Sequence, residues 1–174
     1  MRNLLLLLVV LGTLSFTLSK EVTRNVEIAS ISSGKLAPQI SFKNSDNQTI
    51  DLSKFRGSYV YLNLWTTWSE HSKEELPFLE QHIAKFGTQM HFLNISIDYK
   101  RDRTKWKKHI ETAELSGEQF MVENDWQSDL IKEYNVVKIP RAILIDPQGK
   151  IVDAFAPSPS QEAQLDKLLS SLLK

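Results

Sequence analysis

The chain contains no cysteine among its 174 residues. Without thiols it can form neither a stabilising disulfide nor a metal site built on thiolates, and it cannot use thiol chemistry. Three of its histidines, His82, His91 and His109, also lack the spacing of metal ligands. The sequence therefore predicts a fold that depends on its hydrophobic core alone, with no metal ion and no cofactor.

An excess of charge of either sign is also missing. Lysine plus arginine number 21 and aspartate plus glutamate number 21, so the formal net charge is zero. Such a chain has no overall field that attracts nucleic acid or an anionic membrane. The run 100–109 is basic and contains Trp106, but a solvated helix face with a buried tryptophan is the preferred interpretation. Partners must therefore be recognised through local features, and nucleic acid is not expected among them.

The apolar run near the N-terminus, residues 4–11, is shorter than the roughly 20 residues that a membrane span requires. Arg2 precedes this run, and small or hydroxylated residues follow it through Ser19. This pattern predicts a secretory signal peptide over residues 1–19, and an uncleaved membrane anchor is the weaker alternative. We therefore expect an exported protein of bacterial character, periplasmic or extracellular, with no stable membrane insertion after cleavage.

Residues 20–35 are polar and contain several serines near their end, which predicts a flexible spacer. Residues 36–174 then make one domain, since the chain is long enough for one sizeable core and too short for two. Predicted strands alternate with predicted helices in this domain, which indicates an α/β fold. The first predicted unit is a short β-hairpin over residues 39–52.

The domain is organised around residues 58–77. An almost unbroken apolar run over residues 59–65 predicts a buried strand. The polar residues behind it begin a helix whose apolar side chains share one face: Leu76, Leu79, Ile83 and Phe86. Free backbone N–H groups and the positive end of the helix dipole meet where a strand stops at a helix N-terminus. This turn is therefore the candidate site.

A second informative segment covers residues 136–146, in which Pro140 precedes a predicted strand. A turn with proline and glycine at the favoured positions joins residues 142–145 to residues 150–154 as a hairpin. A last helix follows, with Ser160 as its predicted N-cap and four leucines as its buried stripe.

Residues 65–72, Trp-Thr-Thr-Trp-Ser-Glu-His-Ser, are followed by Glu75-Leu-Pro77. This stretch resembles the active-site segment of thioredoxin-like proteins of the TlpA/ResA type, which are related to the AhpC/TSA proteins. The family segment usually reads W-x-x-W-C-x-x-C with a downstream E-x-P, so Ser69 and Ser72 stand at both cysteine positions. The resemblance covers residues 36–174. It implies a thioredoxin-like fold, in which helices flank a central mixed sheet and an N-terminal β-hairpin is added.

The resemblance also implies a peptide-binding groove. Residues 136–146 resemble the family's V-x-x-x-P-x-x-x-L-I-D, whose proline is cis and faces the redox pair. The side chains expected at the groove are Trp68, Glu70, His71, Glu75, Ile139, Pro140 and Arg141. Such a groove can hold an extended polypeptide without any sulfur.

The two serines have a structural interpretation that is favoured over a catalytic one. Serine is a preferred N-cap, which suits Ser69 at the helix start, and Ser72 with Glu75 has the spacing of a capping box. For Glu75 the resemblance implies a proton-transfer role, but the cap is preferred. A nucleophilic Ser69 activated by His71 is disfavoured, because residues two apart on a helix do not face each other and no oxyanion motif is present. His71 is expected to be solvent-exposed.

Three functions remain open on these residues. The preferred one is a redox-inactive, exported thioredoxin-fold protein that binds polypeptide or supports a redox partner. The second is the family's thiol-disulfide oxidoreductase with its cysteines replaced by serine in the laboratory, and the third is a purely structural interaction module. Thiol–disulfide exchange requires sulfur, which is why the first is preferred and why enzymatic activity is left open.

Overall fold

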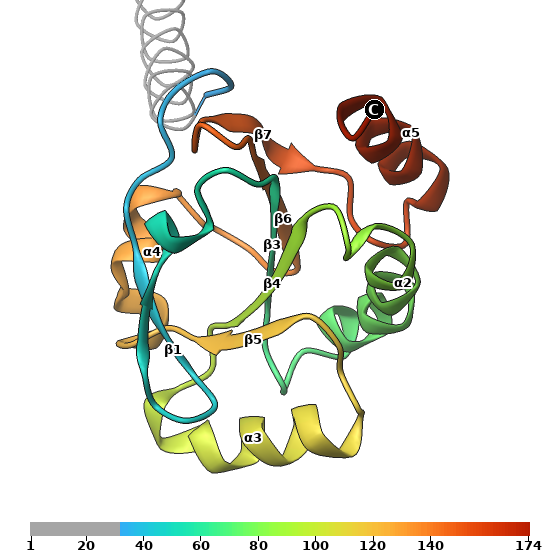
Figure 1. Ribbon diagram of the computed structural model, residues 1–174. Helices are drawn as coiled ribbons and strands as arrows, with labels where there is room; N and C mark the ends of the chain where they lie inside the picture. The colour runs from blue at the N-terminus through green and yellow to red at the C-terminus, as the bar shows by residue number, and fades with distance from the viewer. Residues whose placement is uncertain (1–31) are drawn as a thin grey trace, which may run out of the picture. The chain divides into compact units, whose positions relative to one another are not determined.

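The computed structural model describes residues 32–174 (Figure 1). The predicted signal peptide, residues 1–19, and most of the predicted spacer, residues 20–31, lie outside the described residues. The strands are β1 (Ser41–Asn44), β2 (Thr49–Asp51), β3 (Val60–Trp65), β4 (His91–Ser96), β5 (Glu118–Met121), β6 (Arg141–Ile145) and β7 (Ile151–Ala156). The helices are α2 (Glu70–Phe86), α3 (Arg103–Thr112), α4 (Asp129–Glu133) and α5 (Glu162–Leu172), with short 3-10 turns η2 (Leu52–Phe55), η3 (Lys100–Asp102) and η4 (Asp125–Gln127).

The strands of residues 32–174 form one mixed sheet in the order β2-β1-β5-β4-β3-β6-β7. The inner strands β3, β4 and β5 run parallel, with Val60 opposite His91. β6 pairs antiparallel with β3, and β7 pairs antiparallel with β6. β1 and β2 form an antiparallel hairpin that β1 joins to β5. The predicted α/β class, the mixed sheet and the added N-terminal hairpin are confirmed.

The two faces of the sheet carry separate clusters of buried side chains, and β3 contributes to both because its side chains alternate. Val60, Leu62 and Leu64 belong to the cluster that contains residues of η2 and α4. Tyr61 and Trp65 belong to the cluster that contains residues of α2, α3 and α5. Figure 1 shows α2 and α5 on one side of the sheet and α4 on the other. All residues of β3 are buried, which explains its almost unbroken apolar sequence.

The end of the predicted spacer is already attached to the sheet. The N–H of Gly34 donates to the carbonyl of Ile151 at 2.8 Å, and the N–H of Ile151 donates to the carbonyl of Lys35 at 2.8 Å. Leu36 then forms a β-bridge with Lys150. Regular hydrogen bonding therefore begins two residues before the predicted start of the domain.

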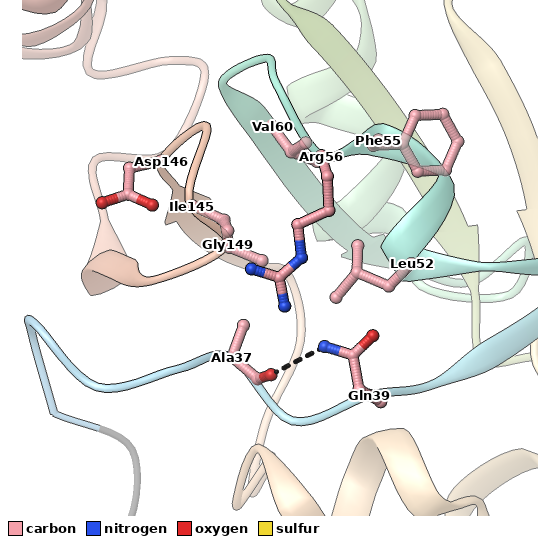
Figure 2. A pocket seen from close by; sticks show the side chains of 9 residues that line it. All are labelled: Ala37, Gln39, Leu52, Phe55, Arg56, Val60, Ile145, Asp146 and Gly149. Carbon is pink, nitrogen blue, oxygen red and sulfur yellow. Dashed lines mark hydrogen bonds between the residues drawn. The ribbon is translucent and has the colours of Figure 1, made fainter.

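Arg56 fastens η2 to the β6–β7 turn. Its guanidinium donates to the carbonyl of Gln148, and Figure 2 shows it between Gly149 and Leu52, close to Ala37. The pocket around it measures about 10 Å³. A space of that size holds at most about one water molecule. This part of the molecule is therefore a structural joint and not a candidate site.

Candidate functional site

Ser69 is the N-cap of α2. Its backbone is extended (φ −87°, ψ 111°), and its Oγ accepts a hydrogen bond from the N–H of Ser72 at 3.2 Å. The predicted capping role of Ser69 is confirmed, and such a cap contributes about 0.5–2 kcal/mol to stability. Trp68, one residue earlier, is 49% exposed, so the turn presents a large apolar side chain to solvent.

Ser72, at the second cysteine position, lies in the first turn of α2 and is fully buried. Its Oγ has no hydrogen-bond partner within residues 32–174. The predicted capping box of Ser72 with Glu75 is wrong. Ser72 stands inside the helix and its N–H is already bound to Ser69, while Glu75 pairs with a different part of the chain.

Glu75 is buried and faces the loop between β7 and α5. Its Oε2 accepts from the N–H of Ser160 at 2.8 Å, and its Oε1 accepts from the Ser160 Oγ at 2.7 Å. The prediction that Ser160 caps the last helix is also wrong. α5 begins at Glu162, and its N-cap residue, Gln161, makes no capping hydrogen bond through its side chain. Ser160 therefore makes a tertiary contact and does not cap the helix, because Glu75 accepts hydrogen bonds from both of its donors.

Two further hydrogen bonds fix the same loop. The Tyr61 Oη donates to the carbonyl of Pro157 at 2.8 Å, and the His82 Nε2 lies 3.0 Å from the carbonyl oxygen of Pro159. Burial, and secondly the charge of Glu75, raise the pKa of Tyr61 well above its usual value, so its hydroxyl remains a donor. The β7–α5 loop is therefore held against β3 and α2 at three places.

The start of the β3–α2 turn is anchored by Asp98. This carboxylate has no solvent exposure and accepts from the N–H and the Oγ of Thr67, each at 3.0 Å. The Ser96 Oγ also donates to it at 2.7 Å. Sequence reasoning gave Asp98 no role, although an aspartate directly after a buried strand was a usable signal. With Thr67 fixed and Ser69 capping the helix, the turn is held on both sides of Trp68.

The loop before β6 contains a cis peptide bond between Ile139 and Pro140. Within residues 32–174, the backbone N–H groups of Val137, Lys138 and Ile139 have no hydrogen-bond partner. The side chain of Val137 is 77% exposed. Unpaired backbone donors next to an exposed apolar side chain can add a further extended strand.

Arg141 was predicted at the rim of the groove, but it is buried. Its Nε and Nη2 donate to the carbonyl of Ala154 at 3.2 and 2.9 Å, and its Nη1 donates to the carbonyl of Asn135 at 2.8 Å. The guanidinium also lies 4.2 Å from the ring centroid of Phe155. Burial lowers the pKa of Arg141 to about 10. The residue therefore supports the loop, because its guanidinium joins the carbonyl of Asn135, just before the loop, to the carbonyl of Ala154 in β7.

A pocket of about 250 Å³, which we call the Pro140 pocket, opens beside this loop. It is lined by Val137, Lys138, Pro140, Arg141, Ala142, Phe155, Ala156, Ser158 and Gln161. Phe155 is 58% exposed and lines the pocket together with Val137 and Pro140, so part of the pocket wall is apolar. Sequence reasoning missed Phe155, because an exposed phenylalanine in a strand carries no motif.

The structure brings together only part of the predicted groove. Pro140 and Arg141 line the Pro140 pocket, whereas Trp68, Glu70, His71 and Ile139 do not. The His71 Nδ1 lies 3.3 Å from the Glu74 Oε2, and both side chains are largely exposed. His71 makes no hydrogen bond to Ser69 in the described part of the chain, so the arrangement of an activated serine is not present.

Across residues 32–174, no three histidine or acidic side chains gather in a way that could hold a metal ion. The same residues include no helix with the length and apolar character of a membrane span.

The order of the sheet, the helix that starts at Ser69 and the cis-proline turn before β6 define a protein of the thioredoxin-like class. Solved structures agree. The thioredoxin domain of a thiol-disulfide oxidoreductase from Bacteroides vulgatus superposes with a TM-score of 0.72 at 25% identity, covering 83% of this chain and 99% of that one. A thiol-disulfide oxidoreductase from Bacteroides fragilis gives a TM-score of 0.69 at 29% identity, covering 80% and 100%.

The chain belongs to the AhpC/TSA family, whose profile matches residues 33–154. Among its relatives are the thiol-disulfide oxidoreductases ResA. The Bacillus thuringiensis protein is 27% identical over 173 residues, which cover 98% of this chain and 94% of that protein. The Bacillus subtilis protein is 29% identical over 150 residues, covering 84% and 79%. The predicted membership of the TlpA/ResA type is confirmed, and this member carries hydroxyls where a thiol pair would be needed for exchange.

Proposed function

We propose that the chain is an exported member of the family that binds an extended polypeptide at the Pro140 pocket without exchanging disulfides. The observation that carries this proposal is the combination, at one loop, of unpaired backbone N–H groups and exposed apolar side chains. The donors belong to residues 137–139, and the apolar side chains are those of Val137 and Phe155.

An extended polypeptide suits both features. Its carbonyl oxygens accept from the backbone N–H groups of residues 137–139, as in other proteins that add a peptide strand. One apolar side chain of the peptide then enters the Pro140 pocket, whose volume of about 250 Å³ accommodates a large aliphatic or aromatic group. Lys138 stands exposed beside the pocket and favours an acidic residue next to that side chain.

The chemistry at Ser69 and Ser72 supports binding without turnover. A serine hydroxyl does not replace the thiolate that attacks a disulfide, and no cysteine elsewhere in the chain can do so. The fixed β7–α5 loop and the Arg141 contacts keep the pocket walls in place, so the binding surface does not depend on sulfur.

The proposal is tested by titrating the full chain with reduced and alkylated insulin B chain, an apolar peptide without free thiols, and following backbone amides by NMR. Saturable shifts are expected at residues 137–139. Val137→Ser should weaken binding, whereas Leu36→Ser, which alters another exposed apolar side chain outside the pocket, should not. The absence of saturable shifts, or equal loss in both variants, contradicts the proposal.

The family enzyme remains the second candidate. It is favoured only by the relatives, which are thiol-disulfide oxidoreductases. Reduction of insulin disulfides by the purified chain would support it, and the proposal predicts a rate equal to that of buffer.

A further inference from the structure

A second pocket, which we call the α3 pocket, lies between α3 and the β3–α2 turn. It measures about 240 Å³ and is lined by Thr67, Lys105, Lys108, His109 and Thr112. None of these residues belongs to the Pro140 pocket. The site is therefore separate from the one to which we assign polypeptide binding.

Four of the five lining residues follow a helical spacing. Lys105, Lys108, His109 and Thr112 stand at positions i, i+3, i+4 and i+7 of α3, which places them on one stripe of the helix. The neighbouring stripe carries Trp106 and Ile110 into the core. The core side chains thus fix the rotation of α3, and this rotation turns the polar stripe toward Thr67.

The donors of this stripe have no acceptor of their own. Within residues 32–174, Lys105 and Lys108 make no ion pair, and Thr112 makes no hydrogen bond through its side chain. The His109 Nε2 is buried and has no partner in the same part of the chain. Lys105, Lys108 and Thr112 are exposed, so water satisfies their donors in the free protein, and the oxygens of a bound anion can replace that water.

Carboxylates neutralise only some of the positive charges around the α3 pocket. Lys73 of α2 stands near His109 but is already paired with Glu70 at 2.6 Å. Asp98, whose charge acts on His109, is fully buried and accepts from Thr67 and Ser96. Among residues 32–174, no carboxylate lines the pocket, and Lys105 and Lys108 are both exposed, so only solvent balances their charges there.

We propose that the α3 pocket binds an oxyanion group, a phosphate or a carboxylate, through the side chains of Lys105, Lys108 and Thr112. Lysine ammonium groups form charge-assisted hydrogen bonds to such oxygens, and a threonine hydroxyl adds a neutral donor. The pocket is larger than a single phosphate group, so the oxyanion is one end of a small molecule or of an acidic side chain.

The test uses the full chain in amide NMR titrations with sodium phosphate and, in a second arm, with sodium succinate. Sodium chloride at matched ionic strength is the reference, because exposed charges respond to salt alone. Saturable shifts at residues 105–112 in either arm support the proposal, and the arm with the tighter binding identifies phosphate or carboxylate as the source. Shifts that sodium chloride reproduces overturn it.

Variants distinguish anion binding at the α3 pocket from a general effect of surface charge. The double variant Lys105→Gln with Lys108→Gln should weaken anion binding by at least about tenfold, because two charge-assisted contacts are lost. Lys107→Gln removes one charge from the same helix outside the pocket and should leave the affinity unchanged. Thr112→Val, which keeps all charges, should weaken binding by about threefold to tenfold. Unchanged affinity in the double variant and in Thr112→Val contradicts the proposal.

Discussion

The carboxylate of Glu75 accepts two hydrogen bonds from Ser160, a residue 85 positions later in the chain. This pair joins the first turns of α2 to the loop that precedes α5. The loop borders the Pro140 pocket through Ser158 and Gln161. A glutamate that motif spacing assigns to a helix cap thus acts as a tertiary anchor for one wall of the proposed binding site.

Glu75→Gln should therefore destabilise the fold. The amide can accept from the Ser160 N–H and donate to the Ser160 hydroxyl, but both hydrogen bonds lose the charge of the carboxylate, which costs about 1–2 kcal/mol at a buried site. Urea unfolding followed by tryptophan fluorescence measures the loss. Glu74→Gln is the matched control, since the Glu74 side chain is 73% exposed and surface changes of this kind stay within about 0.5 kcal/mol. Equal effects of the two variants would contradict the anchor role.

Arg141→Met should destabilise the loop before β6. The change removes three hydrogen bonds and leaves the carbonyl oxygens of Ala154 and Asn135 without their donor, a loss of about 2–4 kcal/mol. Hydrogen exchange at the amides of Asn135 and Val136, which donate to the carbonyls of Lys132 and Ile131, should accelerate together with the loss in unfolding free energy. Exchange rates that stay at the native level in this loop would show that Arg141 does not support it.

His109 makes stability depend on pH. Burial first, and then the charges of Lys73 and Lys105, lower the pKa of His109, while Asp98 opposes this shift. The unfolded chain therefore binds the proton before the folded chain does. The contribution is fully present above the unfolded value of 6.5, and it falls as pH drops from there toward the lowered folded pKa.

Wild type should thus lose more stability than His109→Gln between about pH 7.5 and pH 5, the range around the ordinary histidine pKa. The measurement is the unfolding free energy of both proteins at several pH values in this range. Identical pH profiles would show that the environment of His109 does not disfavour its protonated form.

Cysteine substitutions at the two serine positions test whether the N-terminus of α2 lowers the pKa of a thiol. The thiol of Ser69→Cys would stand at the N-terminus of α2, where thiol pKa values fall from about 8.5 to between about 3.5 and 7.5. Iodoacetamide at neutral pH should therefore label Ser69→Cys at least about tenfold faster than Ser72→Cys, whose side chain would be buried. Mass spectrometry follows both reactions, and equal slow labelling would contradict the electrostatic argument.

The sequence was sufficient for the parts of the fold that local patterns determine. The apolar run of β3, the hairpin of β6 and β7 and the cap at Ser69 all appear where predicted. The capping box predicted from the spacing of Ser72 and Glu75 is wrong. Such spacing takes no account of a buried partner far along the chain, which for Glu75 is Ser160. The same limit explains why Arg141 was predicted at the rim of the groove, since its carbonyl partners come from β7 and from the turn after α4.

The two pockets were harder to foresee for a similar reason. The basic run that contains Lys105 and Lys108 was interpreted as a solvated helix face, and only the position of Thr67 against α3 closes it into a pocket. Phe155 becomes part of a wall only when β7 brings it beside Pro140. Both pockets combine side chains from segments that are distant in sequence, which a local motif cannot describe.

The central claim is that this protein recognises polypeptide without using sulfur. Calorimetric titration with insulin B chain in two forms, one alkylated and one oxidised to an intramolecular disulfide, tests it most directly. The account predicts saturable binding of both forms with similar affinity and recovery of the oxidised peptide with its disulfide intact. Binding of neither form, or release of the oxidised peptide in reduced form, would contradict it.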